Sequence, residues 1–197
     1  FNSILSHGFV VDGKGLKMSK STGNIIAPED ILKKYGADIL RAWVAASDYS
    51  EDLRLDYSIL EQHAESYRKI RNTFRFLLGN LQDKKINFDI NSKEIEKWPE
   101  LERFMLHQIF ILNANFEKYF KEYNFHKLYR ELLNFCSLDL SAFYFDIRKD
   151  TLYCDETTST KRIACIRLLH LILDMLLKWF APILSFTTEE IFNILNK

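Results

Sequence analysis

Over most of the chain after Asp56, apolar residues recur every three or four positions, the spacing that places side chains on one face of an α-helix. The pattern predicts four long helices, over residues 60–81, 99–120, 124–145 and 160–180. Residues 82–98 are mostly polar and are expected to form a long connection. Thr187 and Glu190 have the spacing of a capping box, which predicts a last short helix. Together these elements predict a mainly α-helical bundle.

The first 55 residues have a different pattern, because four of the six glycines of the chain lie before Asn24. Apolar residues predict a short strand over residues 4–11, which leads into a glycine-flanked loop. Pro28 occupies an expected first helical position with two acidic residues after it, so a short helix is predicted there, and Gly36 interrupts it. A second short helix follows, with its apolar positions at Ile39, Leu40, Trp43 and Val44. The polar residues 47–52 predict a solvated loop.

Residues 17–21 read Lys-Met-Ser-Lys-Ser and carry the clearest chemical signal of the chain. Lysine ammonium groups bind phosphate as point charges, so two lysines and two hydroxyl groups on a glycine-flanked segment favour a mobile polyphosphate-binding loop. The alternative is a solvated surface loop, which such a composition usually indicates. Average residue usage produces these five residues by chance in roughly one chain of this length in ten thousand. Chance is therefore a poor explanation of the segment.

Composition narrows the remaining classes of function. The chain has 27 basic and 27 acidic residues, so no global positive field indicates a nucleic-acid partner, and any RNA contact must come from local patches. The three cysteines have no paired Cys-x-x-Cys spacing and the histidines no metal-ligand spacing, so no zinc site, other metal site or disulfide framework is predicted. Cys136 and Cys165 are interpreted as core thiols of a cytoplasmic protein. No apolar run reaches membrane-spanning length.

A basic edge on the first long helix is a second candidate site. Arg68, Arg71 and Arg75 are three and four residues apart, so they share one helix face, with Asn72 beside them. Such an edge can follow an RNA backbone through phosphate contacts. The alternative is a solvated helix face whose arginines pair with nearby glutamates.

Residues 17–21 match letter for letter the second ATP-site motif of the class I aminoacyl-tRNA synthetases. Other segments resemble the isoleucine-specific members of that family. These segments are residues 7–13, 22–24, 35–41, 48–54, 67–73, 76–81, 134–137 and 181–187. The similarity extends over nearly the whole chain.

The resemblance implies a fold and a function. Residues 1–55 would form the C-terminal end of a Rossmann-type α/β catalytic domain, and residues 56–197 an α-helical anticodon-binding domain. The isoleucine-specific enzymes of this family activate isoleucine with ATP and Mg²⁺ and then transfer it to isoleucine tRNA. The catalytic residues would be Lys20, on the ATP phosphates, and Lys17, in support. The ATP-binding residues implied are Lys17, Met18, Ser19, Lys20 and Ser21, of which the two serines either shape the loop or contact the nucleotide.

The same resemblance implies tRNA binding by Arg68, Arg71, Asn72 and Arg75, and a monomeric cytoplasmic enzyme with no membrane contact. Several parts of the family are missing from the chain: the His-x-Gly-His-type ATP motif, the editing domain and the C-terminal zinc-binding cysteines. The chain also begins at Phe1. It is therefore expected to be a piece of such an enzyme and inactive alone. The alternatives are the same region of a valine, leucine or methionine enzyme, a non-catalytic tRNA-binding helical module, and a piece without a function of its own.

Overall fold

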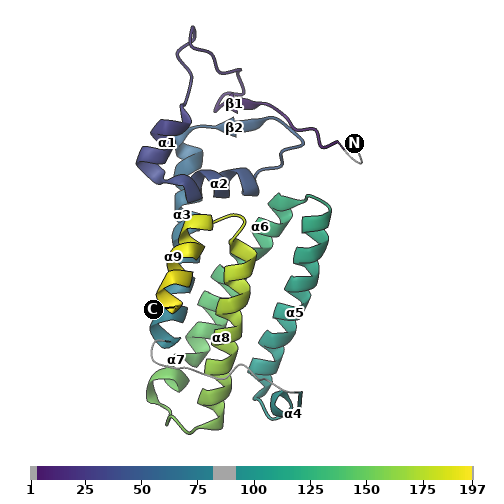
Figure 1. Cartoon of the computed structure of the whole chain (residues 1–197), viewed down its shortest axis with the longest axis vertical. Helices are drawn as coiled ribbons and strands as arrows, with labels where there is room; N and C mark the ends of the chain where they lie inside the picture. The colour runs from purple at the N-terminus through teal and green to yellow at the C-terminus, as the bar shows by residue number, and fades with distance from the viewer. Residues whose placement is uncertain (1–3, 82–91, 197) are drawn as a thin grey trace. The chain divides into compact units, whose positions relative to one another are not determined.

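Figure 1 shows the computed structural model, which describes residues 4–81 and 92–196. The contacts within the chain divide it into two units. The loop unit comprises the described residues of Phe1–Arg68, Tyr119–Arg130 and Phe180–Lys197. The bundle unit comprises those of Lys69–Lys118 and Glu131–Trp179.

The loop unit contains a two-stranded parallel sheet. Strand β1 (Val10–Asp12) pairs with β2 (Leu53–Leu55), with Val11 opposite Arg54 in the register. The strand predicted over residues 4–11 is therefore wrong in extent, because residues 4–9 are irregular. The sequence reading missed β2, because three residues are too short to establish a period of two.

Two short helices lie between the strands in sequence, as the pattern predicted. They are α1 (Pro28–Tyr35) and α2 (Ala37–Ala46), and both predictions are confirmed. Gly36 separates them with a φ of 83°, a left-handed conformation that glycine adopts without strain. Their apolar faces meet β2 and the start of the next helix in a core cluster of Ile31, Trp43, Leu55 and Leu60. This cluster is the base on which the preceding loop rests.

Helices α3 (Tyr57–Leu81) and α9 (Ser185–Leu195) also contribute to the loop unit. Helix α3 confirms the first long helix, and its first turns belong to this unit. Helix α9 confirms the predicted last short helix. The predicted capping box is wrong, because no side chain at the N-cap position of α9 bonds to its first turn. Asp38 of α2 takes that role instead, with one carboxylate oxygen 2.7 Å from the backbone nitrogen of Thr187.

The bundle unit is helical wherever its secondary structure is regular. Its elements are the later turns of α3, α4 (Ser92–Ile95), most of α5 (Glu100–Lys121), the end of α6 (Phe125–Asn134), the π-helical segment η1 (Phe135–Tyr144), α7 (Phe145–Cys154) and nearly all of α8 (Thr160–Phe180). The last turn of α5 and the first turns of α6 belong to the loop unit. Figure 1 shows α7 and α8 running antiparallel. The buried core positions of the bundle unit include Ile70, Leu77, Met105, Leu132, Leu140, Leu169 and Leu176. The predicted helical bundle is confirmed.

Two details of the bundle unit differ from expectation. The third predicted helix continues past residue 145 to Cys154 and contains η1, whose wider turns a period of 3.6 residues does not reveal. The predicted connection 82–98 contains the short helix α4. It also contains Trp98, which is buried because its indole supplies apolar surface that the polar residues around it lack. Residues 82–91 of that connection lie outside the described residues.

Candidate functional site

The lysine segment forms a closed loop between β1 and α1. Lys17 makes an antiparallel bridge with Val11 of β1, so the loop starts as an extension of the sheet. A turn then follows, in which the backbone nitrogen of Gly23 lies 3.3 Å from the carbonyl oxygen of Lys20. Gly23 has a φ of 68°, so a side chain at this position would strain the turn. The backbone of Lys17 is thus held by the sheet, and the backbone of Lys20 by the turn.

Asp12, the last residue of β1, joins the loop to the sheet. One carboxylate oxygen accepts hydrogen bonds from the backbone nitrogens of Lys14 (3.0 Å) and Leu16 (2.8 Å). The other accepts one from the side-chain amide of Asn24 at 2.9 Å. These donors stabilise the charged carboxylate, and the pKa of Asp12 is lowered, first by Asn24 and then by Leu16.

Asn24 uses both ends of its side-chain amide. Its oxygen accepts hydrogen bonds from the backbone nitrogen of Ser19 (2.9 Å) and the hydroxyl of Thr22 (2.6 Å). Its nitrogen donates to Asp12 and to the carbonyl oxygen of Lys17 at 3.2 Å. The backbone on both sides of Met18 is therefore tied to one side chain.

The hydroxyl groups of the loop bond to one another. The Ser19 oxygen lies 3.0 Å from that of Ser21 and 2.8 Å from that of Thr22. The Thr22 hydroxyl also lies 3.1 Å from the Ser19 carbonyl oxygen. These contacts favour a role for the serines in shaping the loop.

The three remaining side chains of the segment divide between core and solvent. Met18 is half-buried and packs against the core cluster, whereas Lys17 and Lys20 are exposed. Within residues 4–81 and 92–196 neither lysine forms an ion pair. Arg54 of β2 adds a nearby cation, since one guanidinium nitrogen would lie 3.8 Å from a Cβ on Gly15. The loop therefore presents positive charge on a fixed backbone, which suits a multiply charged anion.

Asp12 and Asn24 were not assigned a role from the sequence. Each stands next to a loop glycine, at Gly13 and Gly23, and short polar side chains beside glycine are typical of turn-stabilising residues. That signal marks a turn. It does not reveal that the two side chains, twelve positions apart, bond to each other.

The basic edge of α3 is exposed at all four predicted positions, Arg68, Arg71, Asn72 and Arg75. Arg68 is the last residue of this stretch in the loop unit and forms an ion pair with Glu65, as the alternative reading expected. Arg71, Asn72 and Arg75 belong to the bundle unit. In the described part of the chain no ion pair of Arg71 or Arg75 is seen, so their charges are open to solvent.

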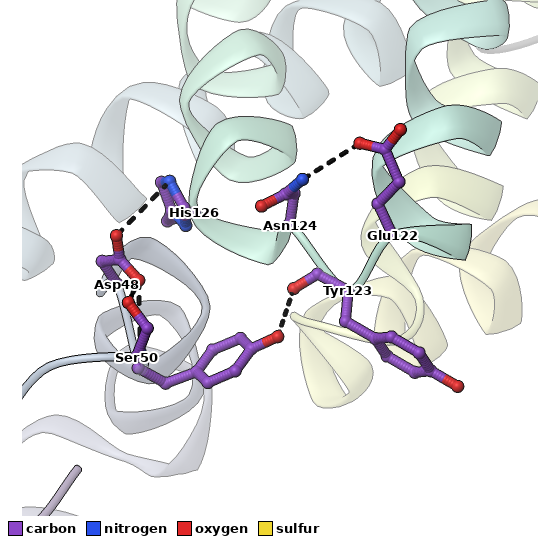
Figure 2. A network of polar contacts seen from close by, with 7 residues as sticks. Asp48, Ser50, Glu122, Tyr123, Asn124 and His126 are labelled. Carbon is purple, nitrogen blue, oxygen red and sulfur yellow. Dashed lines mark hydrogen bonds and ion pairs between the residues drawn. The ribbon is translucent and has the colours of Figure 1, made fainter. Parts of the chain in front are cut away.

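The loop after α2 is anchored to the turn between α5 and α6, within the loop unit (Figure 2). The Tyr49 hydroxyl donates to the carbonyl oxygen of Tyr123 at 2.6 Å, and Asp48 lies 4.0 Å from a ring nitrogen of His126. Asp48 also accepts hydrogen bonds from Ser50, which are the first cause of its lowered pKa. Residues 47–52, the expected solvated loop, are largely exposed, but the contacts of Asp48 with Ser50 and His126 hold the loop in place.

Residues 4–81 and 92–196 contain no group of three or more histidine, cysteine or acidic residues that could hold a metal ion. Within the same ranges, every helix is too short or too polar to cross a bilayer.

Comparison with known families divides the chain in two. Residues 1–56 match the family described as tRNA synthetases class I (I, L, M and V). Residues 102–197 match the family described as the anticodon-binding domain of tRNA ligase.

Curated relatives and a solved structure agree with these matches. The chain is 71% identical over its whole length to the isoleucine–tRNA ligase of Pelagibacter ubique, and 45% identical to that of Geobacter sulfurreducens. It spans 22% and 21% of those two proteins. In fold, it matches a leucyl-tRNA synthetase of Agrobacterium radiobacter K84, solved in a ternary complex with tRNA and LeuAMS, with a TM-score of 0.71 and 18% identity. That match covers 95% of this chain and 22% of the other. The chain belongs to the isoleucine–tRNA ligase family of class I aminoacyl-tRNA synthetases.

Proposed function

We propose that this chain is the part of an isoleucine–tRNA ligase that supplies the ATP-phosphate loop and the anticodon-binding helices. The chain spans about a fifth of the relatives it matches, so the activity is that of a larger protein. That activity is the ATP-dependent formation of isoleucyl-adenylate and the transfer of isoleucine to its tRNA, in the cytoplasm. Residues 1–55 belong to the catalytic domain in this proposal, and residues 56–197 to the tRNA-binding domain. The observation that carries it is the pair of exposed lysines on an internally hydrogen-bonded loop.

The chemistry of activation explains why lysines are needed there. A carboxylate oxygen of isoleucine attacks the α-phosphorus of ATP, and the bond from that phosphorus to the bridging oxygen of pyrophosphate breaks. Negative charge grows on the departing pyrophosphate, and positioned cations lower the barrier where charge develops. Lys20 contacts these phosphates and Lys17 supports it, while Mg²⁺ supplies further positive charge on the phosphates when bound.

The remaining residues of the segment hold the lysines in place. Met18 anchors the loop in the apolar cluster, and Ser19 and Ser21 contribute hydroxyl groups to its internal bonds. In this proposal the ammonium groups of Lys17 and Lys20 bind the nucleotide, and the other three side chains of residues 17–21 fix the backbone.

Replacement of Lys20 tests the catalytic part of the proposal. In the ligase that contains this chain, Lys20→Ala is expected to lower the rate of isoleucine-dependent pyrophosphate exchange by about 10²–10³, as the loss of one transition-state donor does. Lys33→Ala, at an exposed position of α1, is the matched control and should leave the rate unchanged. A normal exchange rate in the Lys20→Ala enzyme would overturn the assignment.

Exposed charge on α3 supports the tRNA-binding part of the proposal. Arg71 and Arg75, with Asn72 between them, lie on the bundle-unit part of the helix and can contact phosphates, and Arg68 extends the same edge along the helix. Arg71→Glu is expected to weaken binding of isoleucine tRNA and to reduce the salt dependence of log K by about one. Arg103→Glu makes the same charge change at an exposed position of α5 and serves as control. Equal affinity and salt slope in both variants would remove Arg71 from the interface.

A further inference from the structure

We propose that Asn24 and Asp12 form a latch that fixes the backbone of residues 17–19, so that Lys17 and Lys20 have a set spacing and direction when they bind phosphate. This inference rests on the proposed function. It assigns the two residues as positioning residues, which act through the lysines and do not themselves touch the nucleotide.

The contacts of Asn24 carry the first step of the argument. Its amide makes four hydrogen bonds within the loop region, two accepted by the oxygen and two donated by the nitrogen. An amide nitrogen has two protons to donate, and both are used, by Asp12 and by the Lys17 carbonyl. All four hydrogen bonds of the Asn24 amide therefore go to protein partners, which lie on both sides of Met18. In this inference the side chain holds the backbone of the loop and does not bind the ligand.

Asp12 carries the second step, because it connects the latch to a fixed element. It lies in β1, opposite Leu55 of β2, and Leu55 is part of the buried cluster. Its own backbone nitrogen donates to the carbonyl oxygen of Leu16 at 2.9 Å, which closes the turn before the lysines. A continuous path of hydrogen bonds therefore runs from the sheet through Asp12 and Asn24 to Lys17 and Ser19.

The chemistry of lysine makes such a latch useful. An ammonium group at the end of four rotatable bonds has no fixed geometry of its own, so its position depends on the backbone that carries it. A glycine-flanked loop without cross-links would have to be ordered when ATP binds or reacts, at an entropic cost to that step. The latch places this ordering in the folded protein instead.

The central test replaces Asn24 in the ligase that contains this chain. Asn24→Ala is expected to lower kcat for pyrophosphate exchange by about 10- to 100-fold, since two or more loop hydrogen bonds that hold the lysines are lost. The KM for isoleucine should be unchanged, and the melting temperature should fall only slightly. Hydrogen exchange of the backbone amides in residues 12–24, measured without ATP, should become faster. Asn193→Ala, at an exposed position of α9, is the matched control and should change none of these values.

A second set of variants tests the direct contact between the two side chains. Asn24→Asp places two carboxylates against each other and should reduce kcat at least as much as Asn24→Ala. Adding Asp12→Asn to it restores a donor and an acceptor at this contact, so part of the lost kcat and of the amide protection should return. No recovery in the exchanged pair would contradict the latch.

The outcomes separate the latch from the proposed function. If Lys20→Ala lowers exchange but Asn24→Ala leaves both kcat and amide protection unchanged, the latch is wrong and the function of the loop stands. If Asn24→Ala lowers the melting temperature markedly and affects the KM for isoleucine as much as kcat, its role is general stability and the latch is also wrong. If Lys20→Ala has no effect, the proposed function itself fails.

Discussion

The carboxylate of Asp38 caps the last helix of the chain through Thr187. One oxygen accepts hydrogen bonds from both the backbone nitrogen (2.7 Å) and the hydroxyl (2.6 Å) of Thr187, and the other lies 3.3 Å from the backbone nitrogen of Phe186. Both Asp38 and Thr187 are buried. Arg41, one turn later on α2, donates to the carbonyl oxygens of Pro182 and Ile183. Helix α2 thereby satisfies backbone groups of the α8–α9 connection and of the first turn of α9.

Removing this cap is expected to destabilise the protein. Asp38→Ala would leave the backbone nitrogens of Phe186 and Thr187 without their acceptor, and the loss should lower the free energy of unfolding by about 1–3 kcal/mol. Asp38→Asn keeps one acceptor oxygen and should cost less. Chemical denaturation measures both effects. Asp146→Ala, which removes an exposed carboxylate on α7, is the control and should change stability little. Equal stability of Asp38→Ala and this control would contradict the capping role.

The cap also shows what the sequence could and could not predict. A short last helix was predicted from a local spacing, Thr187 to Glu190, and the helix is there, although it begins earlier, at Ser185. Its cap comes from Asp38, 149 positions earlier. Local patterns carry no information about such a partner, because only the tertiary fold brings the two segments together.

For the same reason, only part of the candidate site was predicted from the sequence. Lys17 and Lys20 were singled out because their chemistry is legible from residue type and spacing. Asp12 and Asn24 are ordinary turn residues until the loop closes and their side chains meet. The long helices were predictable because their buried positions repeat at the helical period, whereas η1 and the three-residue β2 follow no repeat long enough to detect.

The pKa of Asp12 reports on its contact with Asn24. The hydrogen bond from Asn24 is the largest cause that lowers this pKa, because it favours the charged form. Asn24→Ala is therefore expected to raise the pKa of Asp12 toward that of an ordinary aspartate. Since the folded-state pKa is the lower one, the stabilisation exists above the ordinary aspartate pKa and is lost as the pH falls through the lowered value.

Carboxyl-carbon NMR titration measures this change directly. Asp56 provides an internal control, because its pKa is lowered by the backbone nitrogen of Ile59 and the hydroxyl of Ser58 and not by Asn24. An unchanged pKa of Asp12 in the Asn24→Ala protein, or an equal change at Asp56, would contradict the direct contact.

Breaking a buried ion pair in the bundle unit should lower the free energy of unfolding more than removing the Asp38 cap. Arg148 donates two hydrogen bonds to Glu102, at 2.6 Å and 2.8 Å, and the Tyr144 hydroxyl donates a third at 3.0 Å. Arg148→Met would leave the buried carboxylate without its counter-ion and should cost about 3–5 kcal/mol of unfolding free energy. Replacing Glu102 by Met as well removes the unpaired charge, so the double variant should recover much of the loss.

The control for this pair lies one residue away in the sequence. Lys149 forms an exposed ion pair with Asp146, and Lys149→Met should change stability by no more than about 1 kcal/mol. Urea denaturation of the three variants compares them. If Arg148→Met costs no more than Lys149→Met, the buried pair does not stabilise the bundle unit.

The three cysteines should differ sharply in reactivity. Cys136 is fully buried in η1, and burial raises the pKa of its thiol to about 12. Cys165 is buried in α8, whereas Cys154 is exposed at the end of α7. Because the thiolate is the reactive form, iodoacetamide at pH 8 should label Cys154 in the folded protein and reach the other two after unfolding in urea. Peptide mass spectrometry assigns each label, and Cys154→Ser should abolish the rapid labelling. Rapid labelling of Cys136 without denaturant would mean that the π-helical segment opens readily, which its packed core position argues against.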